Sequence, residues 1–314
     1  MAAKNNINPF IYNELGQIQW FWRLLAFFPI YLILTKLIQV WFQVYDPKSA
    51  DPLLETVWLT IRFGCQAAAV LLLTWIALTV LDKRRFDSFG LSFHERWTKE
   101  VVLGILLGFA LTFLALGLVS LLGTVSLSAQ PFDWVDLTAL IVLQLILWLL
   151  ASISVEAFLR GYVLQVISEA QGKIFASLFL SFLSAILYTQ FRPELWIHGV
   201  NMAVWNLIAC VFYFRTRTLW ASIGLQASAA FFQQVFFGSP VFDIHPTFSL
   251  FHVELTGRNA LTGDYFGVQQ GLLAGSVLVV TLYYLIHTKQ LQVADSVRKA
   301  KYEALTKPFV HLEK

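Results

Sequence analysis

The chain has 314 residues, of which 58% are hydrophobic and 13% are charged, whereas an ordinary soluble domain carries about 25% charged residues. Its mean hydropathy of +0.67 excludes a soluble enzyme and a disordered chain, and indicates a polytopic helical membrane protein. The formal net charge of +3 is too small to indicate a protein that binds nucleic acid. We therefore expect one all-α bundle that spans a lipid bilayer, with no nucleic acid among its partners.

Eight apolar segments have the length that a helix needs to cross a bilayer, about 20 residues. Polar connectors separate these segments, and the fourth continues beyond its core to residue 167. We predict a transmembrane bundle of about eight helices. The predicted spans are 24–42, 57–81, 101–122, 137–161, 174–191, 198–214, 219–236 and 267–286.

Basic residues are distributed unevenly over the connectors. The connector after the third span has neither lysine nor arginine, the C-terminal tail is basic, and the connector after the second span contains Lys83, Arg84, Arg85, Arg96 and Lys99. Basic connectors of membrane proteins lie on the cytoplasmic side. We therefore expect a multi-pass integral membrane protein with both termini in the cytoplasm.

Four residues inside the predicted spans have a simpler interpretation than catalysis. Cys65 and Cys210 both fall within spans, so they provide neither a disulfide framework nor a Cys-x-x-Cys metal site. Lys36 and Arg62 lie in the first two spans, where we interpret them as side chains that extend toward the interface or are buried at a helix contact. We therefore expect the functional residues in other segments.

Glu156 and Arg160 stand in one of the most apolar parts of the chain, just after the leucine-rich run 137–150. They are four residues apart, so on a helix they share a face and can form an ion pair. Ionisable side chains at membrane depth are costly, which makes them functional candidates by default. The alternative is a structural salt bridge in which the two charges neutralise each other, and these two residues alone give it about equal weight.

Several segments share an order and spacing with a known family. Beside VEAFLRG at 155–161 stand LSAILYTQFRP at 183–193 and RTRTLWASIGLQASAAF at 215–231. FGLSFHERW at 89–97 precedes the third span, and LTGDYFGVQQGLL at 261–273 precedes the eighth. In this combination the chain resembles the CPBP family of intramembrane proteases, which includes CAAX-processing and bacteriocin self-immunity ("Abi") proteins.

The resemblance extends from Phe89 to Tyr284 and implies a protease-like intramembrane bundle. It leads us to predict three sequential regions. Residues 1–88 would form an N-terminal membrane hairpin with its basic connector, 89–288 the CPBP-like bundle, and 289–314 a basic cytoplasmic tail. The expected partners are the lipid bilayer and other integral membrane proteins.

The resembled family has three signatures: two adjacent glutamates with an arginine four positions after the second, then Phe-x-x-x-His, then His-x-x-x-Asn or His-x-x-x-Asp. This chain retains Glu156 and Arg160 of the first signature. The resemblance therefore implies a degenerate catalytic site. The changed positions are Val155 for the first glutamate, Tyr188 for the phenylalanine, Arg192 for its histidine, Gln226 for the last histidine and Ala230 for the asparagine.

These changes weaken the chemistry that peptide hydrolysis requires, which is a base that activates water and a group that stabilises the oxyanion. The guanidinium of Arg160 should make Glu156 a weaker base, and the second carboxylate is absent. Arg192 can only donate hydrogen bonds, so it cannot replace a histidine as proton acceptor. Gln226 can donate to an oxyanion but cannot transfer a proton.

A metal-dependent variant of this chemistry meets the same difficulty. A catalytic zinc ion needs three protein ligands, and no histidine remains at the other motif positions. His198 can approach from the start of the sixth span, with Asn201 one turn on, although a histidine that caps a helix is the commoner arrangement. We interpret Gln269 and Gln270 as partners in interhelical hydrogen bonds. We therefore expect no cofactor, and a divalent metal only if an altered protease site is present.

Three functions from different classes follow. The first is a catalytically inactive member of the protease-like family that binds, assembles or stabilises another membrane protein. The second is an intramembrane endopeptidase with an altered site built on Glu156, in which Arg192 and Gln226 act electrostatically. The third is a carrier or pore for a small polar solute, gated by Glu156 and Arg160. Loss of all the motif histidines together favours the first.

Overall fold

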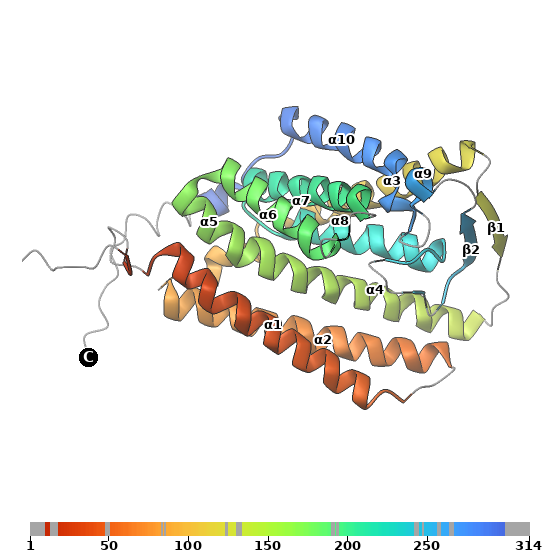
Figure 1. The fold of residues 1–314 in the computed structure, drawn as a ribbon, viewed down its shortest axis with the longest axis horizontal. Helices are drawn as coiled ribbons and strands as arrows, with labels where there is room; N and C mark the ends of the chain where they lie inside the picture. Colours follow the sequence, from red (N-terminus) through yellow and green to blue (C-terminus); the bar gives the residue numbers. More distant parts are fainter. Residues whose placement is uncertain are drawn as a thin grey trace, which may run out of the picture. The chain divides into compact units, whose positions relative to one another are not determined.

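The computed structural model divides the chain into two compact units, which we call unit 1 and unit 2 (Figure 1). Unit 1 comprises Met1–Phe86 and Pro131–Leu180, and unit 2 comprises Asp87–Gln130 and Ser181–Lys314. Each unit therefore joins segments that are distant in the sequence. The structure describes residues 10–12, 18–47, 51–82, 84, 86–122, 125–129, 134–189, 192, 195–241, 245–246, 248–255, 259–263 and 267–298.

Unit 1 is built from long apolar helices. They are α1 (Trp20–Val44), α2 (Pro52–Ile76) with the π-helical turn η1 (Ala77–Leu81), α4 (Trp134–Phe158) with the π-helical turn η3 (Leu159–Val163), α5 (Leu164–Gln171) and the first half of α6 (Lys173–Thr189). Asp51 caps α2, since its Oδ1 accepts a hydrogen bond of 2.9 Å from the Leu53 amide, and Pro52 occupies the first turn. Gly172, with φ of 85°, ends α5.

Helix α2 packs against α4 in unit 1, and α1 contacts α2 and α5. At one end of α1 the ring of Phe42 lies 4.9 Å from the ring of Trp58 on α2. Toward the other end, Phe27 lies 4.3 Å from Tyr162 and 5.8 Å from Phe158. Aromatic contacts therefore fix α1 at both ends.

Unit 2 contains the remaining helices and a small sheet. Its elements, besides the second half of α6 and most of the 3-10 turn η2 (Phe86–Phe89), are α3 (Trp97–Leu121), α7 (Trp196–Thr216), α8 (Trp220–Phe231) with the π-helical turn η5 (Phe232–Phe236), α9 (Asn259–Thr262), the 3-10 turn η7 (Val268–Gln270) and α10 (Leu272–His287), together with strands β1 (Val125–Ala129) and β2 (Phe251–Leu255). Its core holds Trp205, Ile208 and Phe212 of α7 against Leu225 of α8.

Small residues allow α3 and α8 to approach each other closely. A Cβ atom added at Gly104 of α3 would lie 2.1 Å from the carbonyl oxygen of Ala221, and one added at Gly224 of α8 would lie 2.5 Å from the carbonyl oxygen of Val101. Glycine is required at such contacts because any side chain would separate the two backbones. This is the packing mode that membrane helices favour, since apolar burial gives little drive to association in lipid.

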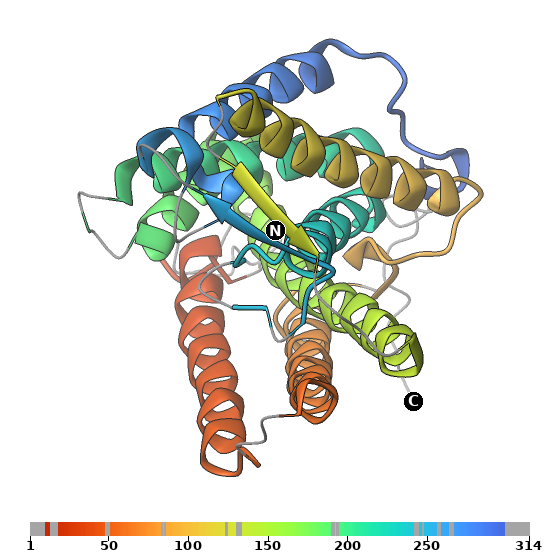
Figure 2. The same ribbon diagram turned by 90° about the vertical axis from the view of Figure 1, so that its right-hand side faces the viewer.

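The two strands were not predicted from the sequence. β1 and β2 pair antiparallel with Val125 opposite Leu255 and Leu127 opposite Val253, and Figure 2 shows them side by side. The alternation of apolar and serine residues in Val125-Ser-Leu-Ser-Ala129 has the two-residue period of a strand. The charge of these connectors, which supports the predicted topology, carries no information about strands.

The helical fold class is confirmed, because each predicted span coincides with helical structure. Five helices among the described residues are long and apolar enough to cross a membrane: Trp20–Val44, Pro52–Leu81, Trp97–Leu121, Leu137–Gln171 and Trp196–Thr216. Lys173–Thr189 and Leu272–His287 are shorter apolar helices. The chain is thus a multi-pass integral membrane protein.

The orientation of the termini and the three sequential regions stay predictions. Lys83 and Arg85 of the basic connector, and positions 299–314 of the tail, lie outside the described residues.

Candidate functional site

Glu156 and Arg160 form the ion pair that the sequence predicted. Glu156 lies in the last turn of α4 and Arg160 in the π-helical turn η3. Arg160 Nη1 donates to Glu156 Oε1 at 2.8 Å, and both side chains are 0% exposed. π-Helical turns are rare and occur frequently at functional sites. The pair is therefore a buried structural element of unit 1 and not a surface ion pair.

A second buried ion pair in unit 1 was not predicted. Arg23 Nη1 of α1 lies 2.7 Å from Oδ1 of Asp82, which directly follows η1, and the two side chains are 3% and 0% exposed. The residues are separated by 59 positions, so helical spacing could not reveal them. The sequence nevertheless contained an indication of this contact. The far ends of two antiparallel spans that are joined by a short loop must lie near each other, and Arg23 and Asp82 stand at those ends. Arg84 and Glu169 form a more exposed pair.

In unit 2, His198 and Asn201 of α7 hold the segment before α10. His198 Nδ1 lies 3.0 Å from the carbonyl oxygen of Gln270, so this ring nitrogen carries the proton and donates it. Asn201 Nδ2 donates to the carbonyl oxygens of Gly271 at 2.8 Å and Gln269 at 3.2 Å. Both side chains are therefore engaged in positioning backbone.

Gln269 also forms a contact between helical segments, since its Nε2 donates to Thr112 Oγ1 of α3 at 2.8 Å. This confirms the interhelical role that was predicted for Gln269. Thr112 in turn donates to the carbonyl oxygen of Gly108 at 3.0 Å, within its own helix. Gln269 and Thr112 thus connect the segment before α10 to α3.

The other motif positions are distributed over several elements. Val155 is half-buried beside Glu156 on α4 in unit 1, and Tyr188 is half-buried in the last turn of α6. The backbone of Arg192 forms the turn after α6, because its amide donates to the Thr189 carbonyl oxygen at 2.9 Å. Gln226 and Ala230 lie one turn apart on α8. Within unit 2 these positions bring no imidazole to α8 or to the turn after α6.

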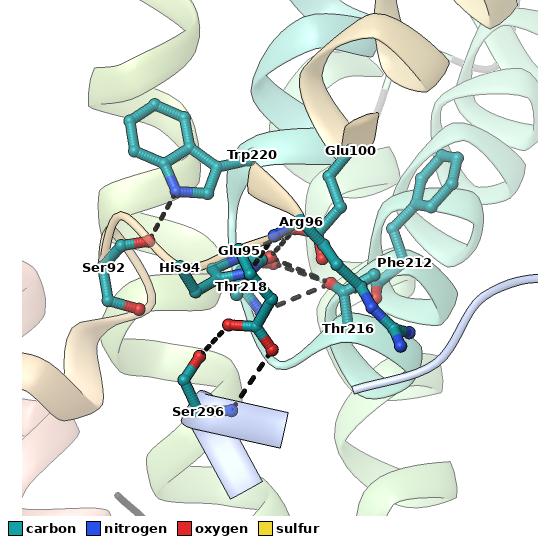
Figure 3. A network of polar contacts seen from close by, with 10 residues as sticks. All are labelled: Ser92, His94, Glu95, Arg96, Glu100, Phe212, Thr216, Thr218, Trp220 and Ser296. Atoms are coloured by element: carbon teal, nitrogen blue, oxygen red, sulfur yellow. Dashed lines mark hydrogen bonds and ion pairs between the residues drawn. The ribbon is translucent and has the colours of Figure 1, made fainter. Parts of the chain in front are cut away.

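A polar network at the start of α3 was not predicted as a site, although its residue His94 belongs to the FGLSFHERW segment (Figure 3). His94 Nε2 lies 3.3 Å from Glu100 Oε2, and these side chains are 2% and 6% exposed. Thr218 donates its hydroxyl hydrogen to the same carboxylate oxygen. Burial lowers the pKa of the His94 imidazole, against the raising effect of the Glu95 carboxylate, while Arg96 adds to the lowering.

The His94–Glu100 pair resembles a catalytic dyad only at first sight. His94 Nδ1 accepts a hydrogen bond of 3.2 Å from the Arg96 amide, so the proton of the neutral ring is on Nε2, which is buried 3.3 Å from Glu100 Oε2. A histidine that acts as general base needs one nitrogen free to take a proton from the reacting group. The geometry therefore supports a structural role, which is to hold the connector before α3 onto the turn between α7 and α8.

Backbone contacts strengthen this attachment. Trp220 Nε1 donates to the Ser92 carbonyl oxygen at 2.9 Å, and the Leu219 amide donates to the Gly90 carbonyl oxygen at 2.9 Å. Glu95 accepts hydrogen bonds from the hydroxyl and the amide of Ser296, the latter at 3.3 Å. The hydrogen bond from the Ser296 hydroxyl is the main reason why the pKa of Glu95 falls to about 2. The connector thus also holds a C-terminal segment.

The described residues do not fit a metal ion. No group of three or more His, Cys, Asp or Glu side chains in the described part of the chain is arranged to hold one. His94 and Glu100 supply two ligands, one fewer than a catalytic zinc site takes from protein. No catalytic step is therefore assigned to a metal.

The fold defines a multi-pass membrane bundle with buried charge pairs. Residues 137–232, which extend from α4 to the beginning of η5, match the family described as type II CAAX prenyl endopeptidase Rce1-like. Residues 137–232, less than a third of the chain, are thus similar to the Rce1-like (CPBP/Abi) family, and the resemblance predicted from the motifs is confirmed for this part of the chain. No curated protein and no solved structure matches the chain.

Proposed function

We propose that this chain is a non-proteolytic member of the Rce1-like family that binds and stabilises another integral membrane protein. The observation that carries the proposal is the state of Glu156, the one motif glutamate that the chain retains. Its carboxylate is completely buried and ion-paired with Arg160 at 2.8 Å. A general base must instead reach the water or substrate group whose proton it takes.

The polar groups of unit 2 support the same conclusion. His198 and Asn201 are occupied with the backbone of residues 269–271, and His94 accepts a hydrogen bond at Nδ1 and has its Nε2 buried beside Glu100. Arg192 and Gln226 stand where the family has histidines, and neither side chain can accept and return a proton at neutral pH. The proton transfers of peptide hydrolysis thus have no evident carrier among these groups.

A binding role requires only the helical framework of the chain and an exposed apolar surface, and α10 provides such a surface. Helix α10 buries Leu278 and Leu285 in the core of unit 2 and exposes Val280, Tyr283 and Tyr284, which are 68%, 66% and 56% exposed. Such an apolar face is suited to a neighbouring membrane helix as well as to lipid. An integral membrane protein is therefore the class of protein partner that this face can accommodate.

Peptidase assays test the catalytic half of the proposal. The purified protein should not cleave prenylated or other membrane-anchored peptides, with or without added divalent metal. Turnover that disappears in Glu156→Gln would overturn the proposal in favour of an altered-site protease. A Glu254→Gln variant is the matched control, because the Glu254 side chain is 67% exposed and distant in sequence from every motif position.

Photocrosslinking in native membranes tests the binding half. A photoreactive amino acid at Tyr284 should yield one dominant adduct with another membrane protein, whereas the same group at the buried neighbour Leu285 should not. Adducts with lipid alone from several exposed positions of α10 would contradict this assignment of the partner surface.

A further inference from the structure

An open apolar groove lies between α1 and α2 in unit 1. It has a volume of about 470 Å³, and its walls include Leu37 and Ile38 of α1 and Ile61 and Cys65 of α2. Leu37 and Ile61 are 63% and 49% exposed, so the groove is open on the side that these residues face. Both helices are long and apolar enough to cross a membrane. A lipid molecule therefore has direct access to the groove.

An aromatic cluster at one end of the groove indicates its depth in the membrane. The Trp41 ring lies 5.0 Å from the Tyr45 ring and 6.1 Å from the Trp58 ring. Trp58 Nε1 donates to the Phe42 carbonyl oxygen at 3.1 Å, which fixes the indole at the groove. Tryptophan and tyrosine gather where hydrocarbon meets lipid headgroups. The cluster thus places this end of the groove at the interface.

Arg62 lies on α2 beside the groove and is not itself one of its lining residues. It follows Trp58 by one helical turn, about 6 Å, and precedes Cys65 by three positions, so both are its neighbours on α2. The side chain is half-buried, its Nε is buried without a hydrogen-bond partner, and no described carboxylate forms an ion pair with it. The guanidinium carbon lies 5.6 Å from the centre of the Phe63 ring, and none of the described residues gives it an anionic partner.

We propose that the α1–α2 groove binds one acyl chain of an anionic phospholipid and that Arg62 binds its phosphate. The charge of Arg62 and the apolar lining match the two parts of such a molecule. An arginine one turn below the interface can extend its guanidinium to the headgroup level. This function does not depend on whether the chain is a protease.

Photoreactive phospholipids test the proposal on the full-length protein in vesicles. The probe is phosphatidylglycerol with a diazirine in its acyl chain, and the comparison is phosphatidylcholine with the same chains. Phosphatidylglycerol should label peptides that contain residues 37–42 and 58–65 about fivefold more than phosphatidylcholine does. One basic side chain at an anionic membrane surface has about this effect.

Matched variants separate the charge from the groove. Arg62→Gln should remove the preference for phosphatidylglycerol, and Arg62→Lys should retain most of it. Lys36→Gln should leave labelling unchanged, because Lys36 Nζ already has a partner within α1 and donates to Gln39 Oε1 at 3.3 Å. Ile61→Trp should fill the groove and abolish labelling by both lipids, while the helix content and elution volume of each variant verify its fold.

Two outcomes would overturn the proposal. Equal labelling by both lipids that Arg62→Gln does not change would mean that only bulk boundary lipid fills the groove. Labelling absent from native membranes but restored when a co-purifying protein is removed would mean that a protein covers it.

Discussion

Replacing Arg160 with alanine should destabilise the protein sharply. The guanidinium lies 2.8 Å from Glu156, and both side chains are 0% exposed, so its removal leaves a carboxylate buried without its positive partner. Breaking a buried ion pair from one side costs about 3–5 kcal/mol. Since 1 kcal/mol shifts the melting temperature of a large chain by about 2 °C, we expect a loss on the order of 6–10 °C.

A thermal-shift assay in mild detergent measures this loss, followed by fluorescence-detected size exclusion. The double variant Glu156→Gln, Arg160→Met should recover part of the stability, because it removes both charges and retains much of the volume. Arg84→Ala is the matched control in the same unit. Its pair with Glu169 is 22% and 45% exposed, and pairs at the surface contribute about 0–1 kcal/mol.

Equal melting temperatures for the wild type, Arg160→Ala and the double variant would refute the reasoning. The pair would then be solvated in the membrane protein, and its burial could not support a structural role for Glu156. Loss of stability in Arg160→Ala without any recovery in the double variant would instead show that the packing of the two side chains, rather than their charge, is what unit 1 requires.

In a variant without Cys65 and Cys210, a cysteine that replaces Phe93, which is 74% exposed, should react only with reagents on the cytoplasmic side. Labelling from outside would contradict the predicted orientation. Gly104→Ala should lower the free energy of unfolding by about 1–3 kcal/mol, because the added Cβ would lie 2.1 Å from the Ala221 carbonyl oxygen. Gly117→Ala on the same helix should have no such effect, because nothing lies within 4 Å of its added Cβ, and equal losses in the two variants would refute the close α3–α8 packing. Because the pKa of Glu95 is lowered from 4.5 to about 2, its contact with Ser296 should persist at neutral pH and be lost as the pH falls through that interval. The loss should appear as faster hydrogen exchange of the Ser296 amide, after correction for its intrinsic rate. In Glu95→Gln the Ser296 amide should exchange faster at pH 7 as well, and an unchanged rate would contradict the contact.

Hydropathy was sufficient to predict the helices, because a bilayer imposes both length and apolar character on every span. It could not predict the π-helical turn at Leu159–Val163, since one additional residue in a turn changes neither property. The paired strands were also missed, although Val125, Leu127 and Ala129 carry the alternating pattern. Short strands in a connector contribute little to a hydropathy profile, which therefore does not detect them.

The candidate site was predictable where its partners are close in sequence. Glu156 and Arg160 are four positions apart, so helix geometry alone indicated their contact. Thr218 and Glu100 are 118 positions apart, and their hydrogen bond depends on the packing of α3 beside α8. Physical rules for one helix do not determine which helices meet, so this part of the site required the structure.

The Arg23–Asp82 pair bears on the synthesis and membrane insertion of the chain. Its two charges close the α1–α2 hairpin at the end opposite the connecting loop, and both belong to the first 82 residues. At about 5–20 residues per second, a ribosome makes the 59-residue interval between them in about 3–12 s. The hairpin can thus neutralise its own buried arginine before residues 137–232 have been translated. Insertion of these two helices as a pair therefore does not have to wait for the rest of the protein.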